Sequence, residues 1–544
     1  MKKQVEEVLK KAVGEGVLVE RAREGYGDYA TNIAFSMAKK EGKNPLELAE
    51  EIRQKIDTDL FSKVEVKGGF VNFFLADDAL WEEMQQVLKQ GEDYGREESG
   101  KTVLIDYSSP NIAKSFGVGH LRSTIIGQSL YNIYSFLGWN TVGVNHLGDW
   151  GTQYGKLLYQ IKAEGKDPEK LSIKELEQMY VRFHQEAEQD EAKEEEGRKW
   201  FAKLEKGDEE ARKIWEICRK KSLEEFNRIY EELEIKIDYV LGESFYEDKL
   251  EDVIKEAVEK EVAIRSEGAL MISFDDMPPA MIEKSDGSTT YLTRDLAAAK
   301  YRLKEFSPDL LLYEIGADQT LHMKQLFRAV EKMGWSPAEK FVHIAHGMFR
   351  LEDGKFSTRK GKTVHLEEVL RVAKEKALEM IELSATEKDM SGEEKEKTAR
   401  LVGVGAVKYN DLMRHHRRDV VFDWERVITL KGNSGPYLQY TCVRCQSILQ
   451  KDNTLEEDYT DLSEKEHHLL RRIAQFKETV HNAQQTNSPN VIADYAYSLA
   501  KEFNAFYDES MIAGNPQRVS VTKATHIILK QCLHLLTISV PEKM

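Results

Sequence analysis

The sequence predicts an α/β protein whose parallel-sheet core carries a helical insertion, with an α+β domain before it and an all-α bundle after it. A strand, a glycine-containing turn, an amphipathic helix and a second strand follow one another from about residue 96. Residues 165 to about 235 are densely charged and helical in pattern. From about residue 365 the pattern is helical almost to the end, broken once at 432–436. We therefore expect domains at 1–95, 96–385 (insertion at about 160–265) and 386–544.

Composition sets the class of protein. Apolar residues make up 41% of the 544 residues, which is enough for several cores. No run of 18 uncharged apolar residues occurs, so we expect no membrane span. The net charge of −17 is weak evidence against a nucleic-acid partner, because phosphate contacts need only local basic patches.

The cysteines and the first residues indicate the compartment. Four cysteines fit a reducing cytoplasm, and the first seven residues lack the apolar stretch of a signal peptide. We expect a cytoplasmic protein. Cys442 and Cys445 form a Cys-x-x-Cys pair, but no second pair lies at zinc-ligand spacing. We interpret the pair as structural and expect no protein metal site.

The first 95 residues predict a small α+β domain. Apolar residues recur at helical spacing in 1–13 and 44–56, and 63–67 and 70–75 form a strand pair around two glycines. Residues 25–32 read GYGDYATN, which is too rich in glycine and aromatic residues for a plain connector. An aromatic-stabilised turn and a binding segment are both open for this stretch.

A β–α–β unit opens the core. Residues 103–105 form a buried strand, 121–137 carry a recurring apolar helical face, and 141–144 form the next strand. Gly117 and Gly119 lie in the turn at the helix start, where a phosphate can approach backbone N–H groups. His120 on the first helical turn can stabilise charge that develops on a phosphate. Alone, the turn fits any nucleotide.

Further segments follow predicted strands and so point to the same cleft, since ligands of open α/β sheets bind at the carboxyl ends of strands. Residues 145–155 follow the second strand of the unit. Strand patterns return at 269–274, 309–315 and 340–345. Residues 314–322 end the second of these patterns and 346–349 follow the third.

Tyr291 and Asp295 lie four residues apart at a helix start, which puts them on one face. A phenol and a carboxylate together match a guanidinium, which offers five donors in a flat fork. The alternative is a helix cap beside a surface tyrosine.

A basic loop spans residues 355–362 and reads KFSTRKGK, with four cations in eight residues. Such a loop suits a triphosphate, because closing over the leaving pyrophosphate would favour the transition state. The alternative is a surface turn.

Together these motifs resemble arginyl-tRNA synthetases of class I, from Gly25 to Met544. SPNIAK at 109–114 and GHLRSTIIG at 119–127 are similar to the family's wording. The sequence departs from the general class I patterns at two positions, and the second departure is shared by many arginyl enzymes. Gly117 replaces the first histidine of the "His-Ile-Gly-His" element, and Thr358 breaks the "Lys-Met-Ser-Lys-Ser" loop.

The resemblance implies a Rossmann-type catalytic core and assigns roles to individual residues. Residues expected to bind arginine are Tyr291, Asp295 and Glu243 at the guanidinium, Gln319 beside it, and Asp106 and Asn111 at the α-amino and carboxylate end. Residues expected to bind ATP are Gly117, Gly119, His120, His322, Gly347, Met348, Lys355 and Ser357. The expected catalytic residues are His120, Lys355, Arg359 and Lys360, and which cation of the loop acts on phosphate stays open.

The implied reaction joins L-arginine to tRNA(Arg) through arginyl-adenylate, with ATP and Mg²⁺. The N-terminal domain would touch the tRNA elbow and the helical bundle the anticodon, with the basic cluster 414–418 along the RNA. A monomer without a membrane partner is implied. Because Gly117 removes one imidazole, two alternatives stay open: a weakened paralogue that binds tRNA or arginine as a regulator, and an enzyme that passes arginine to another acceptor.

Overall fold

The computed structural model describes the chain except for residues 15, 24, 352–353, 356–364, 384–389 and 424–426. Its centre is a five-stranded, fully parallel sheet with the strand order β12-β11-β5-β6-β7. The strands are β5 (Thr102–Asp106), β6 (Asn140–Asn145), β7 (Tyr239–Val240), β11 (Leu310–Gly316) and β12 (Phe341–His346). The strands predicted at 103–105, 141–144, 309–315 and 340–345 are therefore confirmed.

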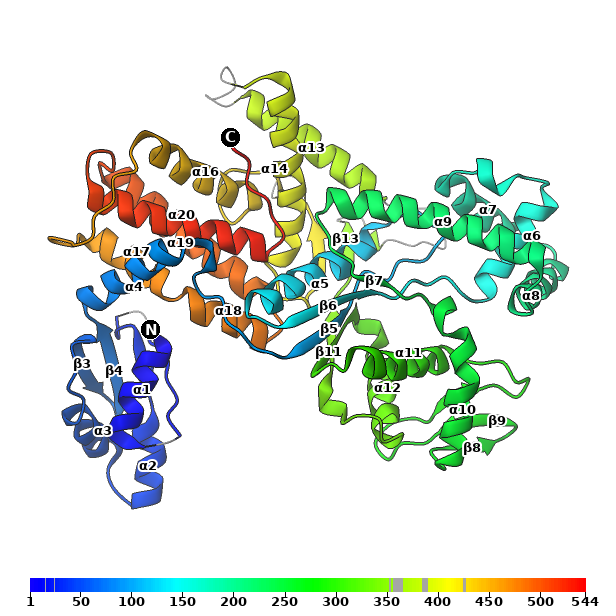
Figure 1. The fold of residues 1–544 in the computed structure, drawn as a ribbon, viewed down its shortest axis with the longest axis horizontal. Coiled ribbons are helices and arrows are strands. Elements are labelled where there is room, and N and C mark those ends of the chain that lie inside the picture. Colours follow the sequence, from blue (N-terminus) through cyan, green and yellow to red (C-terminus); the bar gives the residue numbers. More distant parts are fainter. Residues whose placement is uncertain (15, 24, 352–353, 356–364, 384–389, 424–426) are drawn as a thin grey trace.

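Helices cover both faces of this sheet, as continuous apolar strands require. Helix α5 (Val118–Phe136) lies on one face, and α10 (Leu250–Glu259), α11 (Tyr291–Phe306) and α12 (Thr320–Lys332) lie on the other (Figure 1). Alternate residues of β5 separate into the two cores: Val103 and Ile105 pack with the α5 side, and Leu104 packs with the α11 side. The carboxyl ends of β5, β6, β11 and β12 share one edge of the sheet.

The strand pattern at 269–274 belongs to a separate sheet. It forms β9 (Ala269–Ile272), which lies between β8 (Ala263–Ser266) and β10 (Ala280–Glu283) in antiparallel pairing. Glu267 and Gly268 both have positive φ, as a tight hairpin turn requires. Local hairpin geometry therefore keeps this strand out of the parallel sheet.

The charged stretch is helical, as predicted. Its helices are α7 (Ile173–Ala187), α8 (Ala192–Glu205) and α9 (Glu209–Glu232), and α6 (Thr152–Ala163) comes directly before it. A capping box between Ser172 and Glu175 starts α7. The helices project from the core at the end opposite the N-terminal region (Figure 1).

The N-terminal region pairs an antiparallel sheet of order β1-β2-β4-β3 with helices. Its elements are α1 (Lys2–Val13), β1 (Glu20–Arg21), β2 (Tyr29–Thr31), α2 (Ile33–Glu41), α3 (Pro45–Gln54), β3 (Phe61–Lys67), β4 (Phe70–Leu75) and α4 (Asp77–Gln90). The hairpin around Gly68 and Gly69 and the helices at 1–13 and 44–56 are as predicted. Gly27 adopts φ 95°, and a Cβ there would lie 2.6 Å from the Phe73 carbonyl oxygen.

The C-terminal region is a helical bundle, as predicted. Its helices are α13 (Leu366–Glu382), α14 (Gly392–Leu412), α16 (Gly435–Lys451), α17 (Glu464–Ala474), α18 (Phe476–Gln485), α19 (Asn490–Glu509) and α20 (Pro516–Leu535). Three short strands, β13 (Phe349–Leu351), β14 (Gly354–Lys355) and β15 (Val420–Phe422), form one further sheet. The sequence pattern had not indicated β15, because three residues are too few for a periodic signal.

The N-terminal region docks on the bundle through the 25–32 segment. The Arg471 guanidinium pairs with Asp28 and donates to the Gly27 carbonyl at 3.0 Å. The Tyr29 hydroxyl donates to Glu478 Oε2 at 3.0 Å. Among the helices described, none is long and apolar enough to cross a membrane.

Candidate active site

The loop between β5 and α5 has an unusual backbone. Ser108, Ser109 and Ala113 have φ values of 76°, 47° and 58°, which non-glycine residues adopt only when surrounding contacts hold them. Asn145 Oδ1 accepts from the Ser109 amide at 3.1 Å, and the Ser222 hydroxyl accepts from the Ala113 amide at 2.8 Å. Strain of this kind concentrates at functional sites.

Gly117 and His120 lie where the sequence predicted them. Gly117 is the N-cap of α5, and His120 is on the first helical turn. The His120 Nδ1 atom is buried with no hydrogen-bond partner among the described residues. Burial, reinforced by Lys114 and His346, lowers the pKa of His120 to about 4. The imidazole is therefore neutral at pH 7 and can donate a hydrogen bond to an arriving phosphate.

A chain of charged side chains runs from β5 to α12. Asp106 Oδ2 lies 2.8 Å from Arg302 Nη1, and both side chains are almost fully buried. Arg302 Nη2 lies 3.3 Å from His146 Nδ1, and His146 Nε2 lies 3.8 Å from Asp295 Oδ1. The other Asp295 oxygen lies 2.6 Å from His322 Nε2. The structure thus brings together Asp106 and Asp295, both expected to bind arginine, and His322, which was expected to bind ATP.

The electrostatics of Asp295 suit a cationic ligand. Burial favours its neutral form, but the hydrogen bond and charge of His322, with His146 and Arg302 nearby, hold the pKa of Asp295 below its usual value. The same hydrogen bond raises the pKa of His322. An ionised carboxylate at partial burial is stable only with cationic partners. A bound guanidinium could take over the role of His322.

Glu243 begins the 3-10 helix Glu243–Lys249, close enough to Asp295 for their charges to interact. Burial, with Asp295 and Asp149 adding to it, raises the pKa of Glu243 to about 8. In the unliganded protein this carboxyl is mostly protonated at pH 7. A second negative charge beside Asp295 becomes favourable only when a cation arrives.

Asp149 holds the turn that presents Glu243. Its fully buried carboxylate accepts from the Ser244 amide and hydroxyl, each at 2.8 Å, and pairs with Arg219 at 3.0 Å. A Cβ at Gly242 would lie 2.5–2.7 Å from that carboxylate, so the turn can approach only with glycine there. Arg219 belongs to α9, so the helical insertion supports this corner of the site.

Asn111 is fixed by the 145–155 loop. It forms a parallel bridge with Gly148, and its side-chain oxygen would lie 2.2 Å from a Cβ on that glycine. Tyr291 and Gln319, in contrast, are exposed, and Tyr291 is 66% exposed. Both side chains therefore lie outside the buried chain from Asp106 to His322. Tyr291 and Asp295 do share the first turns of α11, as predicted.

Gly347 and Met348 follow β12. Glu314, 1% exposed at the end of β11, pairs with His346 Nδ1 at 2.9 Å. The Met348 side chain is 47% exposed. Lys355 ends β14, but its side chain and all of Ser357, Arg359 and Lys360 lie outside the described residues. The roles predicted for that loop therefore stay predictions.

Outside this site, Cys442 and Cys445 are buried in α16, and burial raises the pKa of the Cys442 thiol to about 12. Cys442 Sγ lies 3.5 Å from His526 Nδ1. The described residues contain no cluster of three or more metal-ligating side chains that could hold a metal.

Three family models match the chain. The model of the catalytic domain of class I tRNA synthetases for arginine, "tRNA synthetases class I (R)", covers residues 83–424. The "Arginyl tRNA synthetase N terminal domain" covers 1–75 and the "DALR anticodon binding domain" covers 438–544. The chain belongs to the class I arginyl-tRNA synthetases.

Relatives and solved structures agree with this family. An arginine–tRNA ligase of Halothermothrix orenii is 42% identical over 95% of this chain and 94% of its own length. That of Clostridioides difficile is 40% identical over 100% and 98%. The arginyl-tRNA synthetase structure from Plasmodium falciparum superposes with a TM-score of 0.85 at 26% identity, over 100% and 99% of the chains. That from Thermus thermophilus gives 0.84 at 23% identity over both complete chains, which supports the fold.

Sequence reasoning missed three residues of this synthetase's site: His146, Asp149 and Arg302. Arg302 had a signal, because it lies seven residues after Asp295 and so on the same face of α11. His146 and Asp149 lie in the loop predicted to line the cleft, but nothing in the sequence showed which side chains turn inward. Their partners Leu241 and Ser244 are about 95 residues away in the chain.

Proposed function

We propose that this chain is an arginine–tRNA ligase that joins L-arginine to tRNA(Arg), using ATP and releasing AMP and pyrophosphate. The observation that supports arginine as the substrate is the pair of carboxyl groups of Asp295 and Glu243. They lie close enough for their charges to interact, and His322 balances the charge of Asp295. A flat guanidinium with five donors can satisfy both, whereas an ammonium has three donors at one point.

The first step forms arginyl-adenylate. An arginine carboxylate oxygen attacks the α-phosphorus of ATP, an O–P bond forms, and the bond to the bridging oxygen of pyrophosphate breaks. Asp106 and Asn111 orient the α-amino and carboxylate end, and neutral His120 donates to the phosphate on the first turn of α5. His322, which pairs with Asp295, would lie near the nucleotide. The amides of that turn add a positive field where negative charge develops.

The second step transfers arginine. A terminal ribose hydroxyl of the tRNA attacks the adenylate carbonyl, and AMP leaves. No covalent enzyme intermediate is needed, so the protein contributes positioning and charge stabilisation. Lys355, Ser357, Arg359 and Lys360 would act on the phosphates from the basic loop, and Gly347 and Met348 would contact the adenine. Tyr291 and Gln319 would close over arginine once it is bound.

Mg²⁺ would enter with ATP. It commonly keeps several waters and binds substrate phosphates rather than an all-protein cage. The ion would neutralise the phosphates as pyrophosphate leaves.

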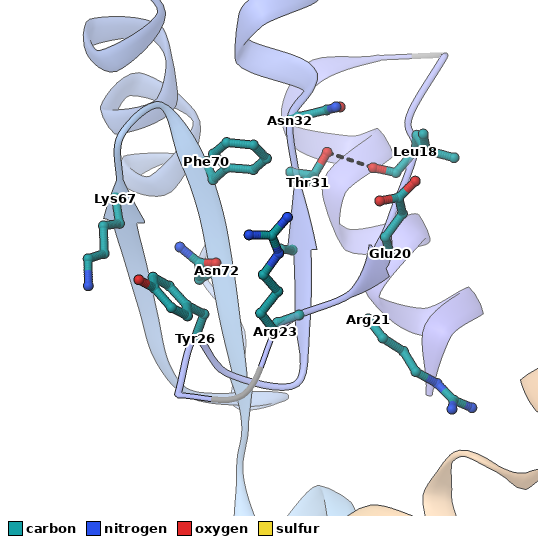
Figure 2. Close-up of a pocket in the computed structure, with 12 residues that line it drawn as sticks. Leu18, Glu20, Arg21, Arg23, Tyr26, Thr31, Asn32, Lys67, Phe70 and Asn72 are labelled. Atoms are coloured by element: carbon teal, nitrogen blue, oxygen red, sulfur yellow. Dashed lines mark hydrogen bonds between the residues drawn. The ribbon is translucent and has the colours of Figure 1, made fainter. Parts of the chain in front are cut away.

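The N-terminal region offers a surface for the tRNA. A cavity of about 610 Å³ lies between the 18–32 segment and the β3–β4 hairpin. Figure 2 shows the side chains of Arg23, Phe70 and Asn72 gathered around it. Lys67 Nζ lies 4.4 Å from the centre of the Tyr26 ring. Exposed cations beside exposed aromatic rings suit a nucleic acid, since one kind binds phosphate and the other stacks on bases.

The domain divisions at 95 and 385 remain part of the proposal, as does a monomeric state. The four cysteines, all free and buried, suit the reducing cytoplasm. The alternatives, a regulatory paralogue or a different acceptor, have no support among the relatives.

The test is arginine-dependent ATP–pyrophosphate exchange and aminoacylation of tRNA(Arg). We expect both activities. A protein that binds tRNA without either would be the regulator instead, and exchange without aminoacylation would indicate another acceptor.

A further inference from the structure

The segment 411–420 runs from the last turn of α14 to the first residue of β15 and contacts both sides of the proposed nucleotide site. Its basic residues 414–418 predicted an RNA-facing cluster. Other groups of this segment have a different role, because two of its carbonyl groups and two of its carboxylates, those of Asp411 and Asp419, bind residues of the catalytic core.

Arg122 is the first of these core residues. It lies on α5, two residues after His120, and its side chain and that of Asp411 are each 1% exposed. Its Nε lies 3.0 Å from Asp411 Oδ2, Nη1 donates to the Arg418 carbonyl at 2.8 Å, and Nη2 donates to the His416 carbonyl at 3.2 Å. A planar guanidinium held at all three nitrogens leaves α5 little freedom to shift.

The turn after β12 is the second contact. The Gly347 amide donates to the His416 carbonyl at 2.9 Å, and the Met348 amide donates to Asp419 Oδ1 at 2.8 Å. The Val420 amide returns a bond to the Met348 carbonyl at 2.9 Å. A Cβ at Gly347 would lie 2.7–2.8 Å from the backbone of residues 418–419, so the two segments touch directly.

The His416 carbonyl accepts from both Arg122 and Gly347, which joins the two contacts. The first turn of α5 and the 346–349 turn are thus held by one segment that follows α14. Near its middle, α14 packs against α16: a Cβ at Gly435 would lie 2.8 Å from the Gly405 carbonyl. Figure 1 shows α14 between the bundle and α5.

We propose that residues 411–420 are a support of the ATP site, in which Arg122, Asp411 and Asp419 act as positioning residues. They hold the first turn of α5, where the phosphates would bind, at a fixed distance from the 346–349 turn. This inference rests on the proposed function, because it takes those two elements as the ends of the bound nucleotide. Its consequence is that the helical C-terminal part of the chain sets the affinity for ATP without touching it.

The decisive variant is Asp419→Ala, because Asp419 is exposed and its loss should not unfold the protein. Its matched control is Asp452→Ala. Asp452 is partly exposed, and its carboxylate also accepts from a distant backbone amide, that of Gly514, at 2.8 Å. The assay is arginine-dependent ATP–pyrophosphate exchange at saturating tRNA, with KM for ATP, KM for arginine and kcat measured separately.

We expect Asp419→Ala to raise KM for ATP about fivefold, as loss of one charge-assisted hydrogen bond would, with KM for arginine unchanged. Asp452→Ala should leave KM for ATP unchanged. Asp411→Asn, which keeps the shape of the side chain, should raise KM for ATP by about tenfold or more. Circular dichroism would verify that each variant is folded.

Unchanged KM for ATP in both folded variants of the segment would overturn the inference. So would an equal rise in KM for arginine, since that would indicate a general loss of structure. Wild-type protein without exchange activity would refute the proposed function instead, so the two failures are distinguishable.

Discussion

The proposed arginine site and the N-terminal cavity both present charge, but they do so in opposite ways. Around Asp295 every charge is partly or fully buried and has a named partner: Asp106 with Arg302, and His322 with Asp295. Around the N-terminal cavity, Arg23 is exposed and Tyr26 and Phe70 are 40% and 44% exposed. The first arrangement suits one small cation in one orientation. The second suits a long polyanion, whose affinity comes from several weak contacts.

The largest loss of activity should follow from removing the carboxylate of Asp295 from the buried site. Asp295→Ala should lower kcat/KM for arginine by more than about 100-fold, because removing one partner of a buried charge pair costs about 3–5 kcal/mol. Asp286→Ala is the matched control, since that carboxylate is exposed in the loop before α11. The measurement is ATP–pyrophosphate exchange. A variant within a few-fold of the parent would show that Asp295 does not bind the substrate.

The next effect concerns pH and belongs to the buried site alone. With the pKa of Glu243 raised to about 8, the unliganded protein holds a proton there that a bound guanidinium must displace. KM for arginine should therefore fall as pH rises toward 8, by up to about tenfold per pH unit, and level off above it. A guanidinium that binds Asp295 would also favour loss of the proton from His322, so this group likewise makes KM for arginine fall as pH rises.

Glu243→Gln removes one of the two titrating groups and should make the profile shallower, leaving the contribution of His322. A KM that rises with pH between 6 and 8 would contradict the assignment of Glu243. The KM for tRNA should not follow the same curve, because Glu20, the one carboxyl group among the described residues that line the N-terminal cavity, is exposed rather than buried.

A smaller effect is expected at the exposed surface. The double change Arg23→Ala and Lys67→Ala should raise KM for tRNA about tenfold and reduce the salt dependence of binding by about two ions. ATP–pyrophosphate exchange at saturating tRNA should be unaffected. Lys39→Ala with Lys40→Ala removes two exposed charges from α2 of the same region and is the control. Equal effects of the two pairs would mean that only the net charge matters.

The smallest effect is expected at Gly117. Its backbone has φ −87° and ψ 159°, an extended conformation that any residue adopts, so glycine is not required by strain. Gly117→His should change the exchange rate by less than about threefold, since His120 and the basic loop remain. A tenfold gain would show that the missing imidazole had been a real loss.

The sequence predicted most of the fold because periodicity is local. The parallel strands, the amphipathic α5 and the charged helices α7–α9 each carry their signal within one element. β9 and β15 show the limit: the first has a strand pattern but joins a different sheet, and the second is three residues long. Partner choice depends on contacts far apart in the chain.

The candidate site divides in the same way. Asp295 was found from its spacing to Tyr291 and from family resemblance. Arg302, on α11, forms an ion pair with Asp106 at the end of β5. Asp149 positions Glu243 by accepting a hydrogen bond from Ser244, which lies 95 residues further along the chain. Such supporting residues gain their role only when the chain has folded. The geometry also separates Tyr291 from the buried network, which spacing alone could not indicate.

The central claim is that the buried carboxyl groups select a guanidinium. ATP–pyrophosphate exchange with arginine, lysine and citrulline as the only amino acid, each at saturating tRNA(Arg) and pH 8, tests it most directly. The account predicts exchange with arginine alone, because lysine offers one ammonium in place of a fork and citrulline carries no charge. Exchange with lysine or citrulline at a rate comparable to that with arginine would contradict it.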